Sequence, residues 1–157
     1  MEAFKVKGGK KLSGTIKPQG AKNEALQVIS AVLLTEEKVS IDNIPNIIDV
    51  NRLIDLLKCM GVSIEKINEH KYSFEASSIN LDYLNAKDFE EKAKGLRGSI
   101  MIIGPLLSRF GHASIPKPGG DKIGRRKLDT HFEGLVKLGA KFQYDKDNYR
   151  YLSLIHI

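Results

Sequence analysis

The loop from residue 116 to residue 131 holds the densest set of side chains that could carry chemistry. It reads PKPGGDKIGRRKLDTH, so paired glycines precede a run of basic residues. Glycines permit positive φ angles and a close approach of the backbone to a ligand, and arginines can hold a phosphate through two hydrogen bonds. The loop therefore predicts a site for a phosphorylated small molecule, although Asp121 taken alone is also a common turn residue.

Two more cations stand where helices are predicted to begin: Lys22 in the run GAKN and Arg97 in the run RGS. Backbone N–H groups at a helix N-terminus attract anions, and each side chain adds a positive charge. Because a cation at a helix start opposes the helix dipole, we expect a compensating anion, which a bound substrate would supply. Taken singly, each motif is also explained by a solvated surface side chain.

The charge pattern favours a small anionic ligand over a nucleic acid. The chain has 25 Lys and Arg against 19 Asp and Glu, a formal net charge of +6. The densest basic run, Lys117 to Lys127, contains no aromatic residue, whereas surfaces that bind nucleic acids usually interleave the two. We therefore expect no nucleic-acid partner.

Composition excludes several other classes of protein. With 157 residues, 41% hydrophobic and 28% charged, the chain is predicted to be globular rather than disordered or fibrous. No apolar run reaches the ~18 residues of a membrane span, and the N-terminus lacks the apolar core of a secretory signal. Cys59 is the only cysteine, so no internal disulfide is possible and the cytoplasm is the expected compartment.

Hydrophobic periodicity predicts alternating helices and strands. Asp49 and the capping box Thr130–Glu133 are expected to start two of the helices, and Pro105 either kinks a third or marks its late start. The predicted helices are 20–34, 49–60, 97–108 and 130–138, and the predicted strands are 39–44, 62–67, 71–76, 112–115 and 140–144.

These elements form two copies of one helix–strand–helix–strand–strand unit of about 75 residues, which predicts an α/β (α+β) fold. The runs LKCMGVSI and LVKLGAKF stand at matching places in the two copies. Such a unit cannot bury both of its faces alone.

Phe4–Lys7 is outside the repeat and reads as a lone strand. Residues 152–157 (LSLIHI) stop mid-strand and match the translation of a common sequencing adapter, so we expect them to be non-native rather than an ordinary terminal strand.

Four motifs in order resemble those of the UDP-N-acetylglucosamine 1-carboxyvinyltransferases, which are bacterial enolpyruvyl transferases. The similarity runs from about Phe4 to Tyr151, and four linked motifs are more specific than any one of them. The motifs are GAKN at 20–23, the helix that begins at Arg97, GPLLSRFG at 104–111 and PGGDKIGRR at 118–126.

The resemblance implies an inside-out α/β barrel, with sheets outside and helices inside. The family has two similar domains, each built from three copies of the unit. Residues 1–21 are then expected to pack with a C-terminal domain that this chain lacks. Residues 22–151 form part of the N-terminal domain, with units at about 22–85 and 86–151.

The implied reaction transfers the enolpyruvyl group of phosphoenolpyruvate to the 3′-hydroxyl of UDP-N-acetylglucosamine and releases phosphate. It is the first committed step of peptidoglycan synthesis, on which cell shape and division depend. It proceeds by addition and elimination through a tetrahedral intermediate, so it needs a general acid for the methylene carbon and cations for the departing phosphate. The two substrates are the implied partners, and neither a metal nor an organic cofactor is implied.

The resemblance also assigns roles to residues. Asp121 takes the place of the loop acid, and Lys22 and Arg126 contact phosphoenolpyruvate. Asn23 positions the substrates and Arg97 contacts the sugar nucleotide. The sugar-nucleotide side is completed by Arg126, Lys127, Leu128, Asp129 and Thr130.

Asp121 stands where most members of the family have Cys. Some members carry Asp there, so activity is still expected, but fosfomycin, which alkylates the thiol, should act poorly. Arg125 also replaces an often small residue. Three alternatives stay open: the sister enzyme 5-enolpyruvylshikimate-3-phosphate synthase, a weak and non-specific nucleic-acid module, and a non-catalytic remnant.

Overall fold

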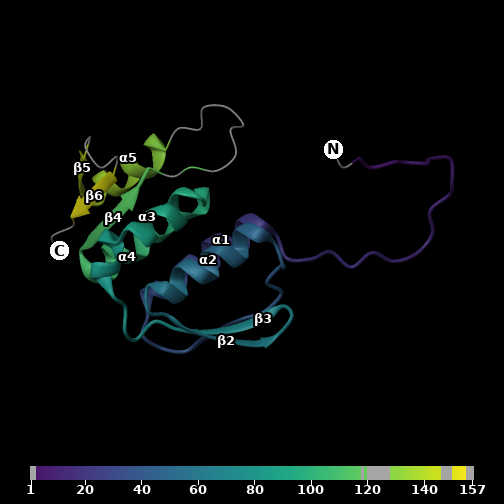
Figure 1. Cartoon of the computed structure of the whole chain (residues 1–157), viewed down its shortest axis with the longest axis horizontal. Coiled ribbons are helices and arrows are strands. Elements are labelled where there is room, and N and C mark those ends of the chain that lie inside the picture. The colour runs from purple at the N-terminus through teal and green to yellow at the C-terminus, as the bar shows by residue number, and fades with distance from the viewer. Residues whose placement is uncertain (1–2, 118, 120–127, 146–149, 155–157) are drawn as a thin grey trace.

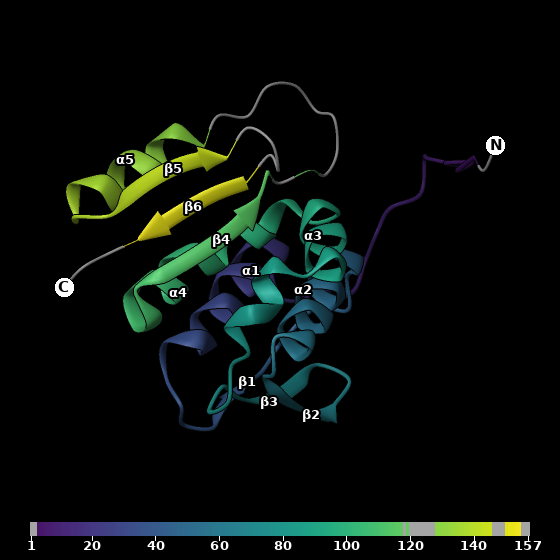
Figure 2. The same cartoon turned by 60° about the vertical axis from the view of Figure 1, so that its left-hand side comes forward.

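Two three-stranded sheets lie on either side of a layer of helices (Figures 1 and 2). The computed structural model describes residues 3–117, 119, 128–145 and 150–154. The α-helices are α1 Lys22–Ala31, α2 Ile48–Cys59, α3 Lys87–Lys94, α4 Ile103–Phe110 and α5 Asp129–Lys137. Three 3₁₀ helices are η1 Val32–Leu34, η2 Leu81–Asn85 and η3 Arg97–Ile102. The strands are β1 Val39–Ile41, β2 Ser63–Asn68, β3 Lys71–Glu75, β4 His112–Pro116, β5 Lys141–Asp145 and β6 Arg150–Leu154.

The two sheets repeat one topology. The first has the order β1-β3-β2 and the second β4-β6-β5, and all four pairings are antiparallel. In each sheet the last strand along the chain lies in the middle. The predicted repeat of helix, strand, helix, strand and strand is therefore confirmed, with η2 and α3 as additional elements that the periodicity did not reveal.

One hydrophobic core joins the two units. α1 packs on α2 and on η3, and η1 packs on α4. Side chains from both units are fully buried in this core, among them Ile29, Leu33, Leu53, Leu57, Phe74, Leu84, Phe89, Ile102 and Leu106. Burying such side chains contributes roughly 1.5–3 kcal/mol each, so core packing fixes the helices on which the candidate site stands.

The two predicted helix caps are wrong. α2 begins after Ile47 and α5 after Leu128, and neither helix start has a side-chain cap. Asp49 and Thr130 lie inside the first turns, whereas a capping side chain must stand on the residue just before the helix. The predicted stops are confirmed, because Gly61 and Gly139 follow these helices with φ angles of 101° and 98°, which glycine adopts readily.

The helix predicted at 97–108 is two elements, η3 and α4. Pro105 lies in the first turn of α4, where its missing N–H removes no helical hydrogen bond, so it marks a late start. The strand predicted at 39–44 ends at Ile41, because Asn43 has a positive φ angle of 58° and turns the chain away from the sheet.

The N-terminal segment forms no strand within the described range 3–21. It runs away from the rest of the chain (Figure 1), and Phe4, Val6, Leu12 and Ile16 are exposed. The strand expected at Phe4–Lys7 is therefore not formed here, and its placement with another domain stays a prediction. At the other end, residues 152–154 belong to β6, while 155–157 lie outside the described residues, so the expected foreign tail also stays a prediction.

Candidate functional site

Six of the nine predicted site residues lie at or beside helix starts. Lys22 and Asn23 open α1, Arg97 opens η3, and Leu128 immediately precedes α5. Asp129 opens α5 and the sixth, Thr130, follows it. The other residues of the prediction, Asp121, Arg126 and Lys127, lie outside the described residues.

Lys22 forms an ion pair with Asp49 across the starts of α1 and α2. Lys22 opposes the dipole of its own helix, and Asp49, in the first turn of α2, has the sign that a helix N-terminus favours. The pair is 43% and 32% exposed, so its contribution to stability is small. The sequence predicted that a bound anion would compensate the charge of Lys22, whereas in the structure the Asp49 carboxylate does so. The spacing of the two residues along the chain did not indicate that they form a pair.

Gly20 allows the start of α1 to pack closely against the loop that follows β1. A Cβ atom at this position would lie 1.9 Å from the carbonyl oxygen of Asn43 and 3.1 Å from Pro45. That loop is itself held, because the Ile44 N–H donates to the carbonyl of His70 at 2.8 Å. The glycine of the GAKN run is therefore required by close backbone contact.

We expect Gly20→Ala to lower the free energy of unfolding by about 1–3 kcal/mol, the usual effect of overpacking. Gly134→Ala is the matched control, since a Cβ there meets nothing within 4 Å inside α5. It should raise stability by about 0.5–1 kcal/mol. Urea unfolding of the two variants measures both effects, and a Gly20→Ala variant as stable as the parent would contradict the contact.

Arg97 is held between α3 and α1. A Cβ atom on Gly98 would lie 3.0 Å from Leu26 of α1, so η3 packs closely there. The Ser99 side chain is fully buried, and its hydroxyl lies 2.9 Å from the carbonyl of Ala93 and 2.7 Å from that of Leu96. These contacts hold the start of η3, where Arg97 stands, against α1.

The end of α3 also supports the start of the glycine-rich loop. A Cβ atom on Gly119 would lie 2.1 Å from the carbonyl oxygen of Lys94, so only glycine fits. The Arg52 guanidinium on α2 donates to the carbonyl of Gly95 at 3.3 Å. The last turn of α3 thus contacts the loop start, α2 and the segment that leads to Arg97.

A largely apolar pocket of about 300 Å³ lies between α1, α4 and α5. It contains His131, the neighbour of Thr130, but none of the six predicted site residues that the structure describes. It is lined by Gln27, Ser30, Ala31, Ile100, Met101, Ile103, Gly104, Pro105, His131, Phe132 and Leu135. Sequence reasoning did not anticipate it.

Three side chains at α3 and the preceding η2 have shifted pKa values: Tyr83, Asp88 and Lys92. Burial raises the pKa of Tyr83, and its hydrogen bond to Asp88 adds to the shift. The Lys92 ammonium lowers the pKa of Asp88, and Asp88 raises that of Lys92. Tyr83 also packs edge-on against Phe89. This cluster ties η2 to α3 and so supports the helix that positions Arg97.

Within the described residues there is no group of three His, Cys, Asp or Glu side chains that could hold a metal ion. The same part of the chain has no helix long and apolar enough to cross a membrane.

Residues 6–155 match the EPSP synthase family, described as 3-phosphoshikimate 1-carboxyvinyltransferase. The chain belongs to the EPSP synthase family. The fold of this family member is shared by the enolpyruvyl transferase NikO from Streptomyces tendae, with a TM-score of 0.73 and 19% identity over 95% of this chain and 31% of that one. The predicted fold class is thereby confirmed.

Curated relatives in the EPSP synthase family carry the name that the motifs predicted. The protein named UDP-N-acetylglucosamine 1-carboxyvinyltransferase from Bacteroides fragilis is 55% identical over 94% of this chain and 34% of its own length. Those of Bacteroides thetaiotaomicron and Porphyromonas gingivalis are 56% and 53% identical. The chain spans about a third of the length of these relatives.

Proposed function

We propose that this chain is the N-terminal part of an enzyme that transfers the enolpyruvyl group of phosphoenolpyruvate to the 3′-hydroxyl of UDP-N-acetylglucosamine. The observation that carries the proposal is the 53–56% identity, over 93–96% of this chain, to relatives named for this reaction. The product would enter peptidoglycan synthesis. The free, exposed Cys59 fits the reducing cytoplasm.

Lys22 is proposed to bind phosphoenolpyruvate at the start of α1. Its ammonium forms an ion pair with the Asp49 carboxylate, and it stands at the start of α1, where helix N–H groups attract anions. Asn23 follows on the same turn and is proposed to orient the substrates. Arg97, beside this turn through the contact of Gly98 with Leu26, is proposed to bind the sugar nucleotide.

The glycine-rich loop is proposed to supply the proton and the remaining cations. Asp121 is the proposed general acid for the methylene carbon, and Arg126 the proposed cation for the phosphate and carboxylate. The close contact of Gly119 with Lys94 supports a loop that starts from a fixed point. The other residues proposed to bind the sugar nucleotide are Lys127, Leu128, Asp129 and Thr130.

The sister reaction, with shikimate 3-phosphate as acceptor, is the second candidate, because the matching family is named for it. The test uses a completed enzyme, in which residues 1–151 of this chain are joined to the rest of the Bacteroides fragilis relative. We expect phosphate release from phosphoenolpyruvate to favour UDP-N-acetylglucosamine by more than about 10²-fold in kcat/KM. A preference for shikimate 3-phosphate would overturn the proposal.

A further inference from the structure

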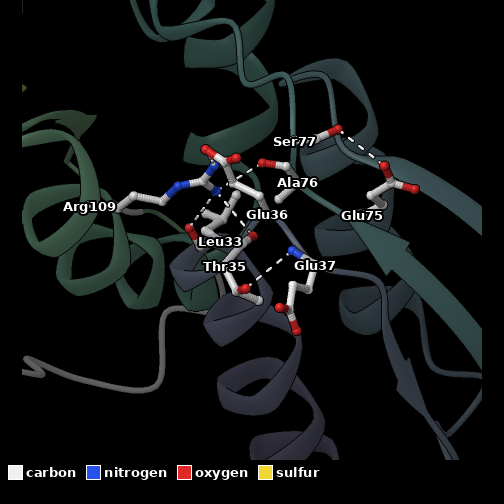
Figure 3. Close-up of polar contacts among 8 residues, drawn as sticks. All are labelled: Leu33, Thr35, Glu36, Glu37, Glu75, Ala76, Ser77 and Arg109. Carbon is white, nitrogen blue, oxygen red and sulfur yellow. Dashed lines mark hydrogen bonds and ion pairs between the residues drawn. The ribbon is translucent and has the colours of Figure 1, made fainter.

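Arg109 at the end of α4 binds the other unit through four hydrogen bonds (Figure 3). Its Nη1 atom donates to the carbonyl oxygens of Leu33 and Thr35, each at 3.1 Å, and of Ala76 at 2.8 Å. Its Nη2 atom lies 3.0 Å from the Glu36 carboxylate. Only 13% of the Arg109 side chain is exposed, so a largely buried cation joins α4 to the end of η1 and to the segment after β3.

The carbonyl partners explain why a cation is stable there. Leu33 and Thr35 lie at the C-terminal end of α1 and η1, where unpaired carbonyl groups carry partial negative charge. The planar guanidinium offers several donors at fixed angles, which an ammonium group does not. Glu36 is 74% exposed, so its ion pair contributes little and the carbonyl contacts dominate.

Two helical rods run side by side between these contacts. The first rod is α1 with η1, residues 22–34, and the second is η3 with α4, residues 97–110. The first elements of the two rods, α1 and η3, contact each other, and so do the last ones, η1 and α4, so the rods are parallel. Lys22 and Arg97 are their first residues, Gly98 meets Leu26 near the starts, and Arg109 joins the ends.

Glu36 and Arg109 occupy equivalent places in the two units. They are 73 positions apart, the same spacing as Leu33 and Leu106 at the matching ends of the rods. The carbonyl contacts of Arg109 favour the observed axial alignment of the two similar units over a shifted one.

We propose that Arg109 is a positioning residue, which sets the axial alignment of the two rods and thereby the separation of Lys22 and Arg97. Its effect on catalysis rests on the proposed function. Because helices are stiff and rise only 1.5 Å per residue, a small slide at the Arg109 end displaces Lys22 relative to Arg97 by the same amount. A misplacement of about 1 Å can cost 10²-fold in rate.

The alignment is measured directly by pulsed spin-label distances in the completed enzyme. Labels on Glu24→Cys and Ser108→Cys, with all other cysteines replaced by serine, report the diagonal between the start of one rod and the end of the other. Arg109→Gln should shift or broaden the distance distribution. Ile64→Ala in β2, outside both rods, is the control for general loss of stability and should leave the distribution unchanged. An unchanged distribution in Arg109→Gln would overturn the proposal whether or not the enzyme is active.

Kinetics test the consequence, at a temperature where all variants are folded. Arg109→Gln should lower kcat/KM for UDP-N-acetylglucosamine by about 10–10²-fold, Arg109→Lys should recover part of the loss, and Glu36→Gln should stay within about twofold of the parent. A loss in Arg109→Gln no greater than in Ile64→Ala would refute the positioning role. An inactive parent enzyme would instead count against the proposed function. The spin-label distances would then test the alignment of the two rods without reference to activity.

Discussion

Asp121→Asn should lower the rate of the completed enzyme by about 10²–10⁴-fold, the usual contribution of a general acid. The asparagine side chain keeps the size and most hydrogen bonds of aspartate, but it cannot deliver a proton to the methylene carbon of phosphoenolpyruvate. Chemistry rather than binding should therefore fail, so kcat should fall much more than the affinity for either substrate.

A carboxylic acid is normally ionised at neutral pH, so the proposed role of Asp121 requires that it gain its proton once the substrates are bound. The negative charges of phosphoenolpyruvate and the exclusion of water both favour the neutral acid there. We therefore expect the formation of the tetrahedral intermediate to slow as the pH rises through neutrality in the parent enzyme, and this pH dependence to be lost in Asp121→Asn.

Single-turnover formation of the intermediate, followed across pH in parent and variant, is the measurement. Glu133→Gln is a matched control of the same chemical change, since Glu133 is an exposed residue of α5. It should leave the rate unchanged. If Asp121→Asn formed the intermediate within a few-fold of the parent, Asp121 would be a loop-shaping residue and not the proton donor.

The second large effect is on inhibition by fosfomycin. The completed enzyme should be inactivated poorly, because the epoxide alkylates a thiol and the carboxylate of Asp121 is a much weaker nucleophile. Asp121→Cys should convert it to an enzyme that is inactivated with time and carries the inhibitor covalently. Mass spectrometry of the loop peptide after incubation with fosfomycin distinguishes the unmodified parent enzyme from the alkylated Asp121→Cys variant.

Cys59 provides the internal control for this experiment. It is exposed and free in the structure, so modification at Cys59 in both proteins would show ordinary thiol reactivity, whereas a modification found only in Asp121→Cys would identify the loop position. Rapid covalent inactivation of the unmodified enzyme, with an adduct on the loop, would contradict the assignment of Asp121.

The repeat and most helices were predictable because they follow from local patterns. The apolar stripes of α1 and α2 and the stop at Gly61 are each encoded within a few residues. Similar sequence runs at equal spacing then revealed the two units. The runs are similar because both units bury their helices in one core. Motif order and spacing were sufficient to predict the family.

The contacts that hold the candidate site were not predictable, because they join residues far apart in the chain. Nothing in the sequence pairs Lys22 with Asp49, and the expected cap at Asp49 was a local reading of a residue whose partner lies on another helix. In the same way, Arg109 is an ordinary basic residue at the end of a helix until the fold brings the carbonyl groups of the first unit to it.

The most direct test of the proposed function compares phosphate release from phosphoenolpyruvate and UDP-N-acetylglucosamine by two proteins: the 157-residue chain alone and the completed enzyme. In the proposed function, Lys22, Arg97 and the glycine-rich loop of this chain form one part of the active site, and the part that follows in the relatives contributes the rest. The proposed function therefore predicts no turnover by the chain alone and UDP-N-acetylglucosamine-dependent turnover by the completed enzyme. Turnover by the chain alone, or a folded completed enzyme that releases no phosphate, would contradict it.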